Sequence, residues 1–376
     1  PAVAGALLAS AGSQYVFMLN ATLSLFAFVL ILRWRSPPAA SALPGERFFG
    51  AMRVGIQHVA QSPRIRTVML RIALFFVHAT AVPALLPLIA RDQHGGGPLS
   101  YTILLSAMGA GAIIAALGLP RLRQRWGRDA LVRIGTLVHA SASVVVVIAP
   151  WLWLAALAMA LAGMALITVA NSLTVAAQLA LPNWVRARGM SIYQMALMGG
   201  GALGAVVWGQ VASHTSITIS VISASGLALL VLLGTRHLMI AACPDEDLTP
   251  APVGTDPTPP AIPIGPKEGP VIVTVEYLID PAESAAFNAV MQETRRARLR
   301  QGALSWGLFR DTAQPGRYIE YFLDENWLEH QRRLERFTAA DLGLRSRRLA
   351  FHKADDEPKV KRYIAEPYSR IPPGHG

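Results

Sequence analysis

Residues 181–209 read LPNWVRARGMSIYQMALMGGGALGAVVWG. A proline corner with Arg186 and Arg188 stands directly before a long apolar segment that contains a run of glycines. Arginines at the end of an apolar helix remain in the polar headgroup region of a membrane, and glycines inside it let a neighbouring helix approach closely. The stretch therefore predicts a helix that enters a bilayer beside other helices.

Further apolar segments of similar length accompany this one. About 20 apolar residues in a helix are enough to cross the roughly 30 Å hydrocarbon core of a membrane. The candidate spans lie at residues 14–32, 68–90, 101–119, 130–149, 151–177, 189–212 and 217–233, after a stub at residues 1–11 that is too short to span alone. The short, even connections predict a mainly α fold, a polytopic transmembrane helical bundle with about seven spans.

The positive charge belongs to the apolar part of the chain. Residues 1–243 contain 16 arginines, no lysine and three acids. The arginines cluster after the first, third, fifth and last spans, whereas the alternate connections hold only Arg91, which Asp92 offsets. By the positive-inside rule, the clusters lie in the cytoplasm and each span switches sides. A nucleic-acid-binding protein would carry such charge on one polar face, so the clustering of arginines between apolar runs argues against that function. The expected partner is the lipid bilayer.

Residues 45–61 predict a different kind of helix. Apolar residues recur at helical spacing and alternate with Arg47, Arg53 and His58. This pattern is typical of an amphipathic helix that lies at the cytoplasmic surface of a membrane. The apolar residues are Phe49, Met52, Ile56 and Val59.

The composition changes after Cys243, the single cysteine, which cannot form an internal disulfide. Residues 244–270 are rich in proline and lack apolar periodicity, so we expect an extended, mostly disordered linker. Residues 271–365 predict a small α+β domain, and residues 366–376 a disordered tail.

The elements of this small domain follow from capping and turn residues. VIVTVEYLI predicts a strand, Asp280 caps a helix, and residues 312–316 predict a hairpin turn. Asn326 caps a second helix, from Trp327 to about Ala340, and residues 348–352 are expected to form the last strand. The order βαββαβ predicts a ferredoxin-like domain.

Two motifs carry a resemblance to a known family. The corner with Pro182, Arg186 and Arg188 resembles that of the major facilitator superfamily, where a Pro-x3-Arg-x-Arg corner precedes the glycine-rich eleventh helix. The segment PRLRQRWGRD, residues 120–129, resembles the superfamily's loop signature between helices eight and nine. Arg125, Gly127 and Arg128 match this signature, whereas Gln124 replaces the usual acid and Pro120 replaces the leading glycine.

The whole chain, tail included, is similar to the bacterial transmembrane secretion effectors, relatives of the enterobactin exporter. The resemblance implies that the spans are helices six to twelve, half to two-thirds of the fold. Missing amino-terminal helices, or a half-transporter partner, would supply the rest. It further implies export of a small amphipathic compound or siderophore by proton-coupled alternating access. The protein would then be an antiporter in the bacterial inner membrane. The tail, similar to antibiotic-biosynthesis monooxygenase domains, would lie in the cytoplasm. No cofactor, metal or catalytic residue is expected.

Polar side chains at membrane depth are candidates for the substrate pathway, because facing lipid is costly for them. Hydrogen bonding between helices remains an alternative. The candidates are Thr168, Asn171 and Gln178 on the fifth span, Ser191 and Gln194 with Met198 on the sixth, and His78 on the second.

Glycines and prolines predict how the spans pack and bend. Gly200 and Gly204 form a Gly-x3-Gly pair, which favours close helix packing, with a flexing gate as the alternative. Pro83 and Pro87 predict a bend in the second span.

Two interpretations of the small domain stay open. A membrane-anchored enzyme with monooxygenase-like chemistry would need a pocket of convergent polar groups. The alternative is a regulatory role or a homodimer through the sheet of this domain, and we expect this one. The candidate polar groups are Trp306, Arg310, Glu320, Trp327, His330 and His352.

Overall fold

The computed structural model describes residues 13–35, 43–93, 98–238, 246–251, 260–354 and 356–366. The predicted stub at residues 1–11, Cys243 and the residues after 366 lie outside this part of the chain.

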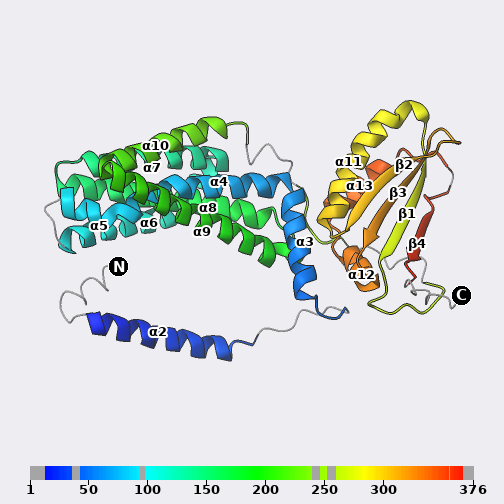
Figure 1. Ribbon diagram of the computed structural model, residues 1–376, viewed down its shortest axis with the longest axis horizontal. Coiled ribbons are helices and arrows are strands. Elements are labelled where there is room, and N and C mark those ends of the chain that lie inside the picture. The colour runs from blue at the N-terminus through cyan, green and yellow to red at the C-terminus, as the bar shows by residue number, and fades with distance from the viewer. Residues whose placement is uncertain are drawn as a thin grey trace, which may run out of the picture. The chain divides into compact units, whose positions relative to one another are not determined.

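The chain divides into two compact units whose segments alternate along the sequence (Figure 1). The membrane unit consists of Pro1–Ala42, Thr67–Ala176 and Tyr193–Cys243. The C-terminal unit consists of Leu43–Arg66, Ala177–Ile192 and Pro244–Gly376. Two short segments that the sequence assigned to the membrane domain thus group with the C-terminal residues.

The seven predicted spans are confirmed as helical segments. In the described part of the chain, seven are long and apolar enough to cross a membrane. They are α2 (Ser13–Arg33), α4 (Pro63–Ala79) continued by α5 (Ala81–Gln93), α6 (Pro98–Arg125), α7 (Arg128–Ile148), α8 (Leu152–Leu179), α9 (Asn183–His214) and α10 (Ile217–Gly234).

The predicted bend in the second span is a break between α4 and α5. Proline cannot donate a backbone hydrogen bond, and its ring clashes with the carbonyl four residues earlier, which for Pro83 is that of Ala79. Helix α4 ends at Ala79, and Thr80 is a turn residue whose Oγ1 donates to the Phe76 carbonyl at 2.6 Å. Helix α5 then accommodates Pro87 in its interior.

Glycines bring helix backbones of the membrane unit into direct contact. A Cβ atom at Gly200 or Gly204 of α9 would overlap the backbone carbonyl of Ala73 or Val77 of α4. The Val77 carbonyl also accepts a hydrogen bond from Trp208 Nε1 at 2.7 Å. Larger residues would force α9 away from α4.

The described residues of the C-terminal unit form one four-stranded antiparallel sheet, in the order β2-β3-β1-β4. Alternate residues of β1 and β3 are buried against helices, and Phe287 and Met291 of α11 complete this core. Figure 1 shows α11 and α13 on one face of the sheet. The elements are β1 (Val271–Leu278), η1 (Pro281–Glu283), α11 (Ser284–Arg300), β2 (Ser305–Arg310), β3 (Arg317–Asp324), α12 (Trp327–Glu335), α13 (Ala339–Leu349) and β4 (Val360–Ile364), with α3 (Phe48–Gln61) preceding them in sequence.

Several local predictions for this unit are confirmed. Asp280 accepts from the Ala282 N–H at 2.9 Å and opens η1, which leads into α11. Gly316, with φ +84°, ends the turn between β2 and β3. Asn326 caps α12 by accepting from the Glu329 N–H at 2.9 Å.

The predictions for the last helix and strand are wrong. The segment expected as one helix is two, because Thr338 and Asp341 form a capping box that starts α13. The expected strand at residues 348–352 is instead the end of α13 and a following turn. The last strand, β4, lies further along the chain.

The predicted linker is ordered at its described ends. The N–H groups of Ala339 and Ala340 donate to the carbonyls of Thr249 and Asp247, each at 3.0 Å. The first N–H groups of a helix have no acceptor within that helix. Here the carbonyls of the described linker residues accept from two such N–H groups of α13. Glu246 adds an ion pair with Arg300 at 2.7 Å.

The glycine contacts make a testable prediction. Gly204→Ala should destabilise the protein by about 1–3 kcal/mol, because the new methyl group overlaps the Val77 carbonyl. Gly199→Ala is the matched control, since a Cβ there meets nothing within 4 Å. It should leave the thermal midpoint in detergent unchanged or raise it through helix propensity. Equal midpoints for the two variants would contradict close packing of α4 and α9.

Candidate functional site

The candidate site is assembled from α9 and the helices around its middle. On α9, Ser191, Gln194 and Met198 are exposed in the described chain and lie three and four residues apart, on one face of the helix. Ser191 Oγ donates to its own helix at the Ala187 carbonyl, at 3.0 Å. The face is polar at its first turn and apolar at its second.

An apolar pocket continues this face of α9. Its volume is about 350 Å³, within the range of small-molecule sites. It lies beside the break at Thr80, whose hydroxyl is occupied by its own helix. Sequence reasoning missed this pocket, although Pro83 and Met198, which it had singled out, both line it. The lining residues are Phe76, Ala79, Thr80, Pro83, Met108, Leu166, Leu197, Met198, Gly201 and Ala202.

The predicted stripe on α8 is only partly an exposed face. Asn171 is exposed, and its Oδ1 accepts from Arg123 Nη2 of α6 at 2.9 Å. Gln178 is also exposed. Thr168 is buried instead, and its hydroxyl donates to the Met164 carbonyl at 2.8 Å.

His78 lies in the packed interior between α4 and α7. It is 3% exposed, and its ring centroid lies 6.1 Å from that of His139. Its Nδ1 donates to the Leu74 carbonyl at 3.1 Å, because a carbonyl can only accept. Neither His78 Nε2 nor His139 Nδ1 has a hydrogen-bond partner among the described residues.

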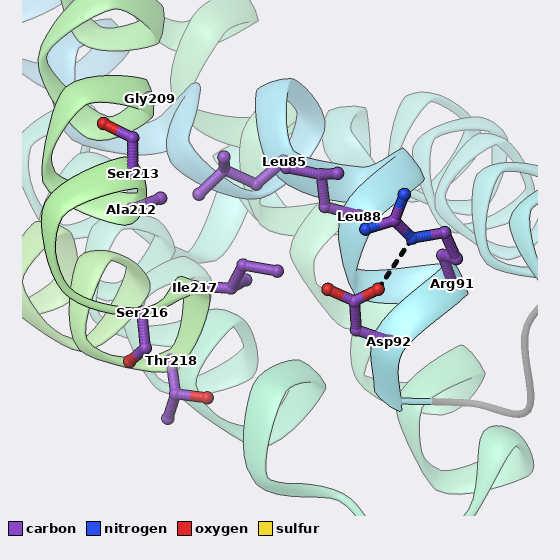
Figure 2. A pocket seen from close by; sticks show the side chains of 10 residues that line it. All are labelled: Leu85, Leu88, Arg91, Asp92, Gly209, Ala212, Ser213, Ser216, Ile217 and Thr218. Carbon is purple, nitrogen blue, oxygen red and sulfur yellow. Dashed lines mark hydrogen bonds and ion pairs between the residues drawn. The ribbon is translucent and has the colours of Figure 1, made fainter.

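A second pocket, of about 510 Å³, lies where α5 and α9 end and α10 begins (Figure 2). Arg91 Nε donates to Asp92 Oδ1 at 2.8 Å on its rim, and Ser213 and Ser216 stand opposite. These helix ends therefore lie at the same end of the membrane unit, as their assignment to outer connections predicts.

The loop-signature residues lie at a sharp junction between helices. Helix α6 runs through Pro120 to Arg125, Gly127 is the N-cap of α7, and Arg128 is its first residue. Sequence reasoning missed an ion pair nearby, between the buried Arg71 of α4 and the partly buried Asp129 of α7. The two residues are 58 positions apart, so no local sequence pattern indicates that they pair.

The arginine corner belongs to the C-terminal unit. Pro182 is buried directly before α9. Arg186 donates from Nε and Nη2 to the Leu181 carbonyl, at 3.4 and 3.3 Å, and so satisfies a carbonyl left free after α8. Arg188 forms an ion pair with Glu46.

In the small domain, Glu320 is the centre of a buried polar network. It accepts from Tyr277 Oη at 2.9 Å, and from Arg298 Nε and Trp306 Nε1 at 3.0 Å each. Burial by itself would raise the pKa of Glu320. The charges of Arg298 and Arg348, with the hydrogen bonds from Arg298 and Trp306, outweigh burial and lower that pKa to about 2.

The other candidate polar groups of this domain belong to separate structural contacts. His330 Nδ1 bonds to Asp324 Oδ2 at 2.7 Å, and Arg333 pairs with the same carboxylate at 3.0 Å. His352 Nδ1 accepts from the Leu278 N–H at 3.0 Å. The candidates do not converge on one point: Arg310 is exposed, and Trp327 packs in the core.

The Glu320 network predicts a pH dependence. A carboxylate whose pKa is lower in the folded state stabilises the protein above its unfolded pKa, and this contribution is lost as pH falls from 4.5 to about 2. Glu320→Gln should cost about 3 kcal/mol at pH 7, because Arg298 keeps a buried charge without a partner. It should also flatten the loss of stability between pH 4.5 and 2, measured by denaturant titration with tryptophan fluorescence. Glu293→Gln, at an exposed ion pair, is the control. Parallel pH profiles for Glu320→Gln and the unmodified protein would contradict the assignment.

Comparisons with known proteins gave one family match and similar solved structures, among them two transporters. The sequence matches the family described as transmembrane secretion effector over residues 1–369. No curated protein matches the chain. The fucose:proton symporter of E. coli is similar in structure, with 15% identity and a TM-score of 0.47, over 60% of this chain and 55% of that one.

A bacterial homologue of the human lysosomal transporter Spinster, in an inward-facing and unoccupied conformation, shares 16% identity. The TM-score is 0.32, over 63% of this chain and 60% of that one. The chain therefore spans less than two-thirds of the length of these two solved transporters.

The described residues contain seven apolar helices long enough to cross a membrane, and the family match covers nearly all of the sequence. This chain belongs to the transmembrane secretion effector family of the major facilitator membrane transporters.

Proposed function

We propose that this chain exports a small amphipathic compound by alternating access, with α9 forming part of the wall of the transport cavity. One observation carries the proposal. On the exposed face of α9, the polar Gln194 lies about one helical turn from the apolar Met198. Met198 also lines the apolar pocket. A compound with a polar and an apolar end matches this order of side chains.

Exposure of polar residues on apolar helices supports the same reading. Asn171 and Gln194 would be costly facing lipid, so we propose that they face an aqueous cavity. The opposite wall would come from helices outside this chain, since alternating access needs two rocking halves. The family description as a secretion effector supports outward transport. A siderophore is one compound of this kind, and the His78–His139 pair is our candidate for proton coupling.

We further propose a ferredoxin-like cytoplasmic domain and a location in the bacterial inner membrane. The antiparallel order β4-β1-β3-β2, with helices on one face, supports the fold. Each of the three segments of the C-terminal unit contains a connection that the positive-inside rule assigns to the cytoplasm. The sheet face with the stacked Phe309 and Tyr321 is our candidate for a homodimer contact.

The α9 face gives a direct test of transport. Gln194→Ala should lower export about tenfold, since losing one hydrogen bond to a buried substrate group costs roughly 1.4 kcal/mol. Met198→Trp should exclude the larger compounds of a series by filling the pocket. Export would be measured as the efflux of amphipathic compounds from cells that produce each variant at equal levels.

Gln210→Ala is the matched control, because Gln210 is an exposed glutamine on the opposite side of α9. It should leave efflux unchanged. If Gln194→Ala and Met198→Trp also leave efflux of every compound unchanged, this face does not bind the substrate.

A further inference from the structure

We propose that the small C-terminal domain is an intramolecular latch that docks on α3 and on the arginine corner of α9, restraining the start of α9 until it is released. All the contacts that carry this inference lie within the C-terminal unit. Only its last step, the restraint of transport, rests on the proposed function.

Helix α3 docks on the end of α11. Gln57 Nε2 donates to the Ala303 carbonyl at 2.7 Å, and His58 Nδ1 donates to the Arg300 carbonyl at 3.3 Å. Carbonyls at and beyond a helix end lack partners within the helix, and two side chains of α3 satisfy them. Val54 is fully buried, and a Cβ atom at Gly302 would lie 3.2 Å from its Cγ2.

Charged contacts surround this apolar and hydrogen-bonded centre. Arg53 of α3 pairs with Glu325, which follows β3, at 2.5 Å. Arg332 of α12 donates to the Pro44 carbonyl ahead of α3. The domain therefore contacts the segment ahead of α3 as well as the middle and second half of the helix.

Glu46 joins the domain to the corner of α9. One of its carboxylate oxygens pairs with Arg336 Nη2 at 3.1 Å, and the other pairs with Arg188. Arg336 is only 4% exposed, and Glu329 and the Gln301 carbonyl fix it in place at 2.9 and 2.8 Å. An arginine of the domain and an arginine of α9 thus share one carboxylate.

Trp184 provides a second hold on the corner. The Arg336 guanidinium lies over its ring at 5.0 Å from the centroid, and the His58 ring packs against it edge-on at 5.4 Å. Trp184 and Arg188 both lie in the first turns of α9, so α3 and the small domain both contact this end of the helix.

The docked side of α3 differs from its apolar side. Phe48, Phe49, Met52 and Ile56 remain exposed, with Phe49 at 83%. Docking therefore leaves the side predicted to lie on the membrane surface uncovered.

A restraint at the corner acts on the whole of α9. The helix is continuous from Asn183 to His214 and carries Gln194 and Met198 further along. Alternating access requires helices to change their tilt about the substrate site. A domain that fixes the first turns of α9 consequently slows that motion, and its release speeds it.

The test uses the isolated Arg53–Glu325 pair, which allows a charge exchange. Arg53→Glu places two acids together and should release the domain, whereas Arg53→Glu combined with Glu325→Arg should restore docking. Spin labels at Phe49→Cys and Ser346→Cys, in a Cys243→Ser background, report docking as a distance distribution in the full chain. Arg347→Gln, which removes an exposed ion pair of the same domain, is the control.

We expect a narrow distance distribution for the unmodified protein, the control and the double variant, and a broad one for Arg53→Glu. Efflux should rise severalfold for Arg53→Glu alone. A narrow distribution for Arg53→Glu would overturn the docking. A broad distribution with unchanged efflux would overturn the latch while leaving the transport proposal intact. If neither the unmodified protein nor any variant transports, the transport proposal and the proposed restraint both fail. The distance distributions then test only whether the domain docks.

Discussion

The membrane unit depends on the approach of α9 to α4 at Gly200 and Gly204. Inside a bilayer, helices gain little from excluding water, so backbone contact and interhelical hydrogen bonds hold them together. Here the carbonyls of Ala73 and Val77 occupy the space of two missing side chains, and Trp208 donates to one of them. The same contact leaves the other side of α9 uncovered, with Gln194 and Met198 on it.

The C-terminal unit is stabilised by buried ion pairs and cation–π contacts instead of backbone contact at glycines. Its core buries carboxylates beside arginines, and the guanidinium carbons of Arg298 and Arg333 lie over the Phe322 ring, 4.3 and 4.2 Å from its centroid. Such buried charges are costly unless every partner is present, which favours one arrangement of the helices over the sheet. Our latch proposal requires this single arrangement, because the domain contacts both α3 and the corner of α9.

Local sequence patterns accounted for much of the fold. The spans followed from apolar length, the break at Thr80 was anticipated as a bend from Pro83, and the cap at Asn326 followed from side-chain chemistry. The last strand was misplaced because the capping box of Thr338 and Asp341 starts a new helix, so apolar residues expected in a strand end that helix.

The site was harder to predict, because its contacts join residues far apart in sequence. Glu46 and Arg336 are separated by 290 residues, and no periodicity relates them. Thr168 was expected beside Asn171, but its hydroxyl bonds to its own helix and turns inward. The apolar pocket is formed by residues from five helices, α4, α5, α6, α8 and α9, so its residues look like ordinary lipid-facing or core positions in the sequence.

Transport along α9 requires that the Gln194 face of this helix borders water and not lipid. The most direct measurement is labelling of Gln194→Cys and Leu203→Cys, each in a Cys243→Ser background, by a water-soluble maleimide in native membranes. Leu203 is an exposed residue half a helical rotation away. We expect rapid labelling of Gln194→Cys and little labelling of Leu203→Cys. Equal rates at the two positions, or no labelling at Gln194→Cys, would contradict it.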